Sequence, residues 1–385
     1  MQYQEGYLLD KRYRLEQYVG SGSFGEVWVA LDQETDLEVA TKIYIAMDEK
    51  GLEEFKKEFQ LSFELNHTNL LHANYLGVNE EDRRPYLVMP YCPDGSVSKY
   101  AGNMEEEKLW RFIHDTAAGL AYLHAQNPPI IHQDIKPDNI LILKSGDYVI
   151  TDFGISRQLR QSMRKSQLSL SSAGAISYMG PERFSKSFQA VKASDLWSLG
   201  AAIYELAAGD VPFCGMGGSL QKQGADMPEL PDQYSRELGL ICYSCLAKET
   251  WNRPTAAQLR DYAAQIIDHK EAVITWRLSP EVEAYLKARD EQEKAAAQEP
   301  VAESVAEPVA EPVAEPVAEP VQEPVAEQPV EEVSGVVTDD NLAAPEDSGF
   351  ISEPSKPEQK PSPLGIVLCI LIGLAIGMAA GFLLL

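Results

Sequence analysis

A proline-spaced repeat late in the chain limits which residues can form a compact fold. The tetrapeptide Val-Ala-Glu-Pro recurs through residues 301–327, with a valine at every fourth position. Because proline removes a backbone donor and blocks a helix, residues 299–330 are expected to be a disordered, extended spacer of polyproline-like geometry. Residues 331–363 continue as polar, acidic sequence that cannot bury enough apolar area to fold, so a disordered acidic linker is expected there. A compact fold therefore has to be built mainly from the residues that precede this tail.

The excess of negative charge is concentrated in the same tail. The chain of 385 residues has a formal net charge of −26, and residues 299–360 contain sixteen acidic and two basic residues. A general nucleic-acid binder needs a basic face that neutralises phosphates. The charge therefore argues against a nucleic-acid partner.

The cysteines are odd in number and show no metal-binding framework. They are Cys92, Cys214, Cys242, Cys245 and Cys369. No secretory signal is visible at the polar, acidic N-terminus, so a reducing compartment and free thiols are expected. Cys242 and Cys245 have the spacing of metal ligands, but no second pair or histidine cluster accompanies them. We interpret them as two small apolar residues on a buried helix.

Residues 364–385 contain no charged side chain. As a helix they would be roughly 33 Å long, which is enough to cross the hydrocarbon layer of a membrane. A buried core helix is the alternative, but nothing foldable adjoins the segment. We therefore expect a single-pass tail anchor. Lys356 and Lys360 precede it, and their positive charge favours a cytoplasmic location for the N-terminal side.

Small residues recur at every fourth position of this predicted membrane helix. They are Gly365, Cys369, Gly373, Gly377 and Gly381. Such a stripe lets two helix backbones approach closely, so a homodimer through the stripe is one expectation. Small residues are also common in membrane helices that do not associate, and this alternative stays open.

The first 270 residues change from strand-like to helix-like patterns along the chain. Stretches rich in β-branched and aromatic residues predict strands at 13–19, 25–32, 37–45 and 85–89. Apolar residues at helical spacing predict one helix at 52–65 and later helices at 109–123, 193–208 and 255–268. A small strand-rich part followed by a larger helical part predicts two lobes.

A glycine-rich stretch lies between the first two predicted strands. It contains Gly20, Gly22 and Gly25 and is followed by Val27, which opens the strand Val-Trp-Val-Ala-Leu. Glycine allows a backbone to approach phosphate oxygens closely. A dinucleotide-binding turn would open a helix at this point, whereas this stretch continues as a strand. The next predicted strand supplies Lys42.

With these and later motifs the sequence resembles the eukaryotic-type (Hanks-type) serine/threonine protein kinase family, in a bacterial-like style. The later motifs are His-Gln-Asp-Ile-Lys-Pro-Asp-Asn at 132–139, Asp-Phe-Gly at 152–154, Gly-Pro-Glu at 180–182, Asp-Leu-Trp-Ser-Leu-Gly at 195–200 and Trp-Asn-Arg-Pro-Thr at 251–255. The resemblance covers residues 10–270 and implies an α+β fold with a small β-rich N-lobe and a larger α-helical C-lobe. A helical extension is expected at 271–298.

The resemblance implies that ATP and Mg²⁺ are bound. Lys42 would bind the α- and β-phosphates, with Glu58 as its orienting partner and Glu54 as the nearby competitor. Asn139 and Asp152 would supply the oxygen ligands that Mg²⁺ prefers. The residues implied to contact the nucleotide are Gly20, Gly22, Gly25, Val27, Ala40, Lys42, Glu58, Met89 and Cys92.

Two residues of the catalytic-loop motif would act on the transferred group. Asp134 would accept the proton of the substrate hydroxyl. Lys136 is typical of members that act on serine and threonine, and it would steady the γ-phosphate. The resemblance thus implies transfer of the γ-phosphate to protein serine or threonine.

Other motif residues are expected to act as internal braces of the helical lobe rather than in the chemistry. They are His132, Glu182, Asp195 and Arg253. As part of the same family comparison, three positions depart from the usual pattern. Gln133 replaces an arginine that normally pairs with a phosphate on the activation segment, so switching by phosphorylation there is in doubt. Ala175 and Gly180 replace a threonine and an alanine near the peptide-binding surface.

We therefore expect an active serine/threonine protein kinase held at the cytoplasmic face of a membrane. The alternative is a membrane-anchored pseudokinase scaffold, whose hallmark would be loss of Lys42, Asp134 or Asp152; all three are present. In a third interpretation the chain is chiefly a tether whose acidic repeat recruits a basic partner.

Overall fold

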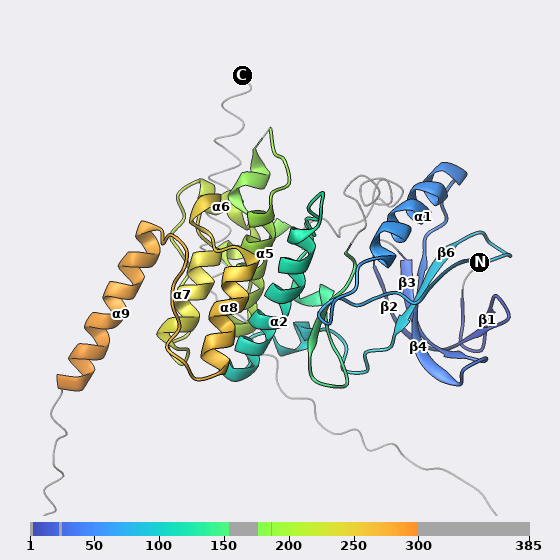
Figure 1. The fold of residues 1–385 in the computed structure, drawn as a ribbon, viewed down its shortest axis with the longest axis horizontal. Coiled ribbons are helices and arrows are strands. Elements are labelled where there is room, and N and C mark those ends of the chain that lie inside the picture. Colours follow the sequence, from blue (N-terminus) through green and yellow to red (C-terminus); the bar gives the residue numbers. More distant parts are fainter. Residues whose placement is uncertain (1–2, 23–24, 154–175, 186, 299–385) are drawn as a thin grey trace, which may run out of the picture. The chain divides into compact units, whose positions relative to one another are not determined.

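The computed structural model describes residues 3–22, 25–153, 176–185 and 187–298 (Figure 1). Within these ranges, no helix is both long enough and apolar enough to cross a membrane. The predicted spacer, acidic linker, membrane span and glycine stripe all fall in residues 299–385, outside the described residues. The predictions for Cys369 and Ala175 lie outside them as well.

Six strands form an antiparallel sheet in the N-terminal part, in the order β1-β2-β3-β4-β6-β5. The strands are β1 (Leu8–Leu9), β2 (Tyr13–Gly22), β3 (Gly25–Asp32), β4 (Leu37–Tyr44), β5 (Tyr75–Val78) and β6 (Pro85–Pro90). Val27 of β3 pairs with Lys42 of β4, and Ala40 of β4 pairs with Met89 of β6. Because residues 40 and 42 are two positions apart in a strand, their side chains lie on the same face. This register collects the predicted nucleotide-binding side chains on one face of the sheet.

One helix accompanies the sheet. Helix α1 (Glu49–Phe63) follows β4, and Phe55 packs edge-on against Tyr44 with ring centroids 4.7 Å apart. Both rings are buried. The helix begins three residues before the predicted range 52–65 and ends two residues before its end.

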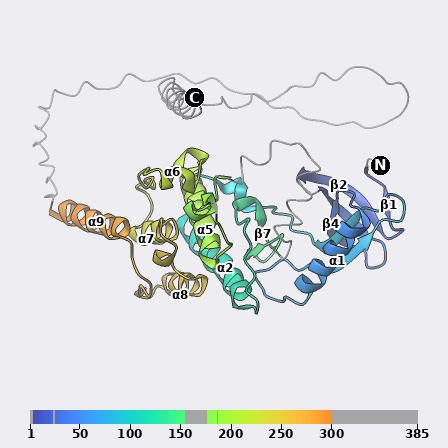
Figure 2. The same ribbon diagram turned by 90° about the horizontal axis from the view of Figure 1, so that it is seen from above.

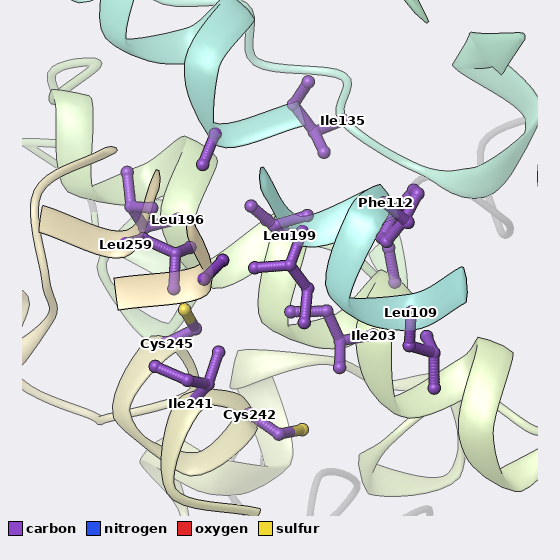
Figure 3. Packing of buried hydrophobic residues seen from close by; sticks show 14 of the residues in the cluster. Leu109, Phe112, Ile135, Leu196, Leu199, Ile203, Ile241, Cys242, Cys245 and Leu259 are labelled. Carbon is purple, nitrogen blue, oxygen red and sulfur yellow. The ribbon is translucent and has the colours of Figure 1, made fainter. Parts of the chain in front are cut away.

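Helices dominate the second part of the fold (Figure 1). They are α2 (Glu106–Ala125), α5 (Lys192–Ala208), α6 (Gly218–Lys222), α7 (Arg236–Cys245), α8 (Ala256–Ile267) and α9 (Pro280–Gln298). Figure 3 shows side chains of α2, α5, α7 and α8 meeting in one apolar cluster. Cys242 and Cys245 are fully buried in it as free thiols, which confirms their interpretation as small apolar residues. Within the described residues, no group of three or more possible metal ligands is present.

The region after residue 270 is helical only in part. Residues 271–279 have no regular structure, and α9 begins at Pro280. Proline is well suited to the first turn of a helix because its missing N–H has no partner there. The preceding segment lies along α8, where the Val273 amide donates to the Gln265 side chain. Helix α9 then packs beside α7 (Figure 2). The predicted extension over 271–298 is therefore wrong for its first nine residues, where β-branched Val273 and Ile274 disfavour a helix.

Candidate active site

A cavity of about 410 Å³ lies between the sheet and the helical part. Several predicted nucleotide and metal residues line it: Gly20, Val27, Ala40, Lys42, Met89, Cys92, Asn139 and Asp152. They come from β2, β3, β4, β6 and the segment after β6 on one side and from the loops around β7 (Ile140–Ile142) and β8 (Tyr148–Ile150) on the other. Burial raises the pKa of the Cys92 thiol above its usual value, so this thiol stays protonated at neutral pH. The structure thus brings together residues that are more than a hundred positions apart.

Lys42 and Asp152 form an ion pair across this cavity. The Lys42 Nζ lies 2.6 Å from both carboxylate oxygens of Asp152. Both side chains are largely shielded from solvent, with 14% and 17% of their surface exposed. Asp152 itself has a φ of +61°, in the left-handed region that aspartate tolerates better than most residues. The pair fixes a cation and an anion where a nucleotide phosphate and its metal would meet.

Two further glycines of the predicted loop do not line the cavity. Gly22 pairs with Gly25 at the tip of the β2–β3 hairpin. Gly25 has a φ of +149°, and a Cβ there would lie 2.0 Å from the carbonyl oxygen of Ile43. Gly25 is therefore required by the close approach of β3 to β4, whatever it does for a phosphate.

The predicted partner of Lys42 lies on α1, but the side chain of Glu58 is outside the described part of the chain. The Lys42–Glu58 pair therefore stays a prediction. Its competitor Glu54 has a half-exposed side chain 3.9 Å from Lys50, one helical turn away. This placement gives Glu54 a surface role and no part in the cavity.

The catalytic-loop motif is arranged around Asp134. The Asn139 side-chain nitrogen donates to the main-chain oxygen of Asp134 at 2.6 Å and to its carboxylate at 3.1 Å. The Lys136 Nζ lies 3.9 Å from the same carboxylate. The amide nitrogen of Asn139 is used in these contacts, which leaves its amide oxygen as the atom that could coordinate a metal. Neither Asp134 nor Lys136 lines the cavity itself.

Asp195 of α5 holds the start of this loop. Its side chain is fully buried and accepts hydrogen bonds from the main-chain nitrogens of His132 and Gln133, each at 2.8 Å. The His124 ring nitrogen lies 2.9 Å from the same carboxylate. The His132 ring contacts the carbonyl of Thr151 at 3.0 Å and so connects the loop to the residue before Asp152. These contacts confirm that His132 and Asp195 are braces.

Glu182 and Arg253 form the other predicted brace. Arg253 donates to both carboxylate oxygens of Glu182, at 3.1 and 2.9 Å, and its side chain has no exposed surface. Burial alone would raise the pKa of Glu182, but the hydrogen bonds and charge of Arg253 outweigh it and hold the pKa below its usual value. A Cβ at Gly180 would lie 2.7 Å from this carboxylate. Gly180 therefore makes room for the ion pair.

Gln133 makes a backbone contact but offers no charge. It has a φ of +66°, and its main-chain oxygen accepts a hydrogen bond from Arg183 at 2.9 Å. Its side-chain oxygen is buried and has no hydrogen-bond partner among the described residues. A neutral amide in this position has no means of forming a charged pair with a phosphate.

The structure reveals one site contact that the sequence did not indicate. The Tyr178 hydroxyl donates to Glu205 of α5 at 2.5 Å, and Ser198 donates to the Tyr178 carbonyl at 2.7 Å. Burial raises the pKa of Glu205, although the hydrogen bond from Tyr178 works against this. The contacts hold the segment before Pro181 in place. Neither residue belongs to a recognisable motif, so no sequence signal marked the pair.

A sheet lobe and a helical lobe that close on a lysine–aspartate pair, beside a braced loop carrying an aspartate and an asparagine, define a protein kinase domain. The protein kinase domain family model matches residues 13–265, and the chain belongs to this family. The predicted bilobal fold is thereby confirmed.

Three curated relatives illustrate the match, and each of the three has a kinase name. A probable serine/threonine-protein kinase of Dictyostelium discoideum is 33% identical over 259 residues, which are 64% of this chain and 50% of that protein. The serine/threonine-protein kinase PknA of Mycobacterium tuberculosis is 33% identical over 221 residues, 55% of this chain and 50% of the relative. The mitogen-activated protein kinase kinase kinase YODA of Arabidopsis thaliana is 30% identical over 264 residues, 66% of this chain and 29% of that protein. The chain thus spans half or less of the length of these relatives.

Proposed function

We propose that this chain is an active serine/threonine protein kinase that transfers the γ-phosphate of ATP to protein hydroxyl groups. The observation that carries the proposal is the pair of contacts around one cavity: Lys42 on Asp152, and Asn139 on Asp134. Phosphoryl transfer needs charge neutralisation and alignment more than covalent help, and these four side chains supply both. The names of the curated relatives support the same activity.

The nucleotide would enter between the sheet and the loops. Its adenine would lie against Ala40 and Met89, with the backbone of Cys92 as hydrogen-bond partner, and its phosphates would reach Lys42 beneath Gly20. Most of these side chains are apolar, as is usual for a site that buries a flat ring.

The donor set fits Mg²⁺. The Asp152 carboxylate and the Asn139 amide oxygen are hard ligands on the same side of the cavity. Mg²⁺ is commonly held by one or two such groups together with substrate phosphates, so two protein ligands suffice. Asp152 and Asn139 would hold the ion, which would neutralise the charge of the phosphates.

The substrate hydroxyl would be positioned at Asp134. Asn139 fixes this carboxylate through its side-chain nitrogen, so that one oxygen is oriented to accept the hydroxyl proton. Lys136, whose Nζ lies 3.9 Å from the same carboxylate, would compensate the charge of the γ-phosphate during transfer. Serine and threonine are the proposed acceptors.

The proposal includes attachment to the cytoplasmic face of a membrane through residues 364–385. Its support is the uncharged length of this sequence and the two lysines before it. Association of two chains through the glycine stripe is the second part of this proposal. Fractionation of cells that express the full chain, beside a chain ending at residue 363, tests the anchor. A membrane dimerisation reporter with and without Gly377→Ile tests the stripe; an unchanged monomer signal would refute association.

The activity is tested on the full chain in detergent with γ-labelled Mg-ATP and a protein substrate mixture. Label on serine and threonine is expected, with a loss of at least about 100-fold in Lys42→Ala and Asp134→Asn. Mapping of the labelled sites identifies the acceptor class. Folded wild-type protein that binds ATP and transfers no label would overturn the proposal in favour of the pseudokinase scaffold.

A further inference from the structure

A second cavity lies on the helical lobe, away from the nucleotide site. It has a volume of about 550 Å³ and is lined by α2, by α5, by the first turn of α8 and by the loops on either side of α8. Trp251 and Trp276 contribute large aromatic side chains, and Pro254 and Leu196 add apolar surface. Trp251 is 66% exposed, although a tryptophan normally buries most of its surface. We call this cavity the Trp251 groove.

The Trp251 groove is basic, whereas the chain as a whole is acidic. Its exposed charged residues are Lys192 and Arg277, and no aspartate or glutamate lines it. In the part of the chain that the structure describes, neither cation forms an ion pair. Two unpaired cations beside exposed aromatic surface fit an acidic segment that also carries apolar or proline side chains.

The repeat at 301–327 has this chemistry. It carries one glutamate in every four residues, at 303, 307, 311, 315, 319, 323 and 327, with proline and valine between them. Proline-rich segments of polyproline geometry dock in aromatic-lined grooves because little conformational entropy remains to be lost. Since the repeat is periodic, it can bind the groove in several equivalent registers. This raises the probability of the bound state.

The repeat is long enough to reach the groove of its own chain. Arg277 precedes the start of α9 by three residues, a distance of about 10 Å at most. The 19 residues of α9 span about 28 Å along the helix axis. The repeat starts three residues after α9 ends and would extend to about 80 Å in polyproline geometry. It can therefore return along α9 and still fill the groove.

We propose that the acidic proline repeat docks in the Trp251 groove of the same chain, with its glutamates on Lys192 and Arg277 and its prolines and valines on Trp251. This inference does not depend on kinase activity. The docked repeat would shorten the connection between the kinase domain and residues 331–385. It would also cover the largest exposed aromatic side chain on the described surface.

The test is hydrogen–deuterium exchange on the full chain in detergent, followed at residues 190–197 and 248–259. Deletion of residues 301–327 is expected to accelerate exchange in both stretches by about threefold or more. The double variant Lys192→Glu/Arg277→Glu should reproduce this acceleration. Raising the salt to 0.5 M on unchanged protein should do the same, because the Debye length then falls to about 4 Å. Lys287→Glu is the matched control, because this lysine is 80% exposed on α9 and lies outside the groove.

A charge exchange makes the test specific. Changing the seven repeat glutamates to lysine should remove the protection, and combining this change with Lys192→Glu/Arg277→Glu should restore it. Equal exchange in the full and the deleted chain would overturn the proposal. Protection that disappears on tenfold dilution would also overturn it, because the occupant would then be the repeat of a second copy. The experiment measures hydrogen–deuterium exchange and not activity, so it can be interpreted even if the protein is inactive.

Discussion

Arg253 and Glu182 face each other in a two-point ion pair, with Arg253 Nη2 2.9 Å from the Glu182 carboxylate. Arg253 also donates to the main-chain oxygens of Ala247, Lys248 and Ala193. One guanidinium therefore joins Glu182, the start of α5 and the loop between α7 and α8. Every donor of this buried group has an acceptor, which is the condition under which burial of a charge is tolerated.

Arg253→Met is expected to destabilise the protein by about 3 kcal/mol or more, because the buried Glu182 carboxylate and three carbonyls lose their donor. Urea unfolding followed by circular dichroism measures the change. Arg260→Met is the matched control, since Arg260 is 40% exposed and pairs with its neighbour Asp261. Equal small losses in the two variants would contradict the role of the buried pair.

The Glu182 carboxylate should make stability depend on pH. Its pKa in the folded protein lies below the ordinary 4.5. A lowered pKa contributes stability that is present above 4.5 and is lost as the pH falls through the folded-state value. Urea midpoints of wild type and Glu182→Gln, measured from pH 7 to pH 3.5, should therefore differ most near neutrality and converge in acid. A difference that grows toward low pH would show that the sign is wrong.

Asn139 is expected to have two separable roles. Asn139→Ala removes both the donor to Asp134 and the proposed metal ligand, so kcat should fall by about 100-fold and the Mg²⁺ requirement should rise. Asn139→Asp retains the proposed oxygen ligand but loses the donor to Asp134. Its Mg²⁺ requirement should therefore return to that of the wild type, whereas its kcat should stay low. Titrations of activity against Mg²⁺ distinguish the two. Asn103→Ala, at an exposed position, is the control.

Gln133 should make activity insensitive to phosphatase. We expect protein treated with phosphatase to retain about half or more of its activity, because a neutral amide gains nothing from a nearby phosphate. Gln133→Arg would place a second cation beside Arg183, so the unphosphorylated variant should be less active and should recover on phosphorylation. Activity assays before and after treatment provide the comparison. Complete loss in the wild type would refute the expectation.

Gly239 on α7 sets the position of α9. A Cβ at Gly239 would lie 2.0 Å from the hydroxyl oxygen of Tyr285 on α9. Gly239→Ala should therefore cost about 1–3 kcal/mol in the free energy of unfolding, despite the better helix propensity of alanine. In a Tyr285→Leu background the same change should become stabilising by about 1 kcal/mol. If Gly239→Ala still lowered the free energy of unfolding in the Tyr285→Leu background, the contact between α9 and α7 would be contradicted.

The sequence predicts the regular elements best where a pattern is long. The predicted strand at 25–32 coincides with β3 (Gly25–Asp32), and α5 (Lys192–Ala208) begins one residue before its predicted range. Strands β7 and β8 were not predicted, because three residues each are too few to show an alternation. Their importance comes from the loops that they position, which is a tertiary property.

Among the site residues, the motifs predict the cluster but not the reason for each member. Lys42, Asn139 and Asp152 meet at the cavity because their motif order is tied to one fold. Gly25 instead serves the approach of β3 to β4, which depends on strand register. The Tyr178–Glu205 contact joins residues 27 positions apart. Neither the approach of β3 to β4 nor the Tyr178–Glu205 contact has a spacing pattern in the sequence. Only the three-dimensional structure reveals these two contacts.

The ion pair between Lys42 and Asp152 joins the two lobes, because Lys42 lies on β4 of the sheet and Asp152 follows β8. Without nucleotide, opening the lobes must separate two opposite charges in a shielded site. If Mg-ATP binds as proposed, the phosphates would contact Lys42 and the metal would contact Asp152, so the two residues would stay connected through the ligand. Lys42→Ala is therefore expected to remove this contact between the lobes as well as to weaken the proposed phosphate binding. Asp134→Asn should leave the Lys42–Asp152 ion pair in place, so it tests the chemical step separately.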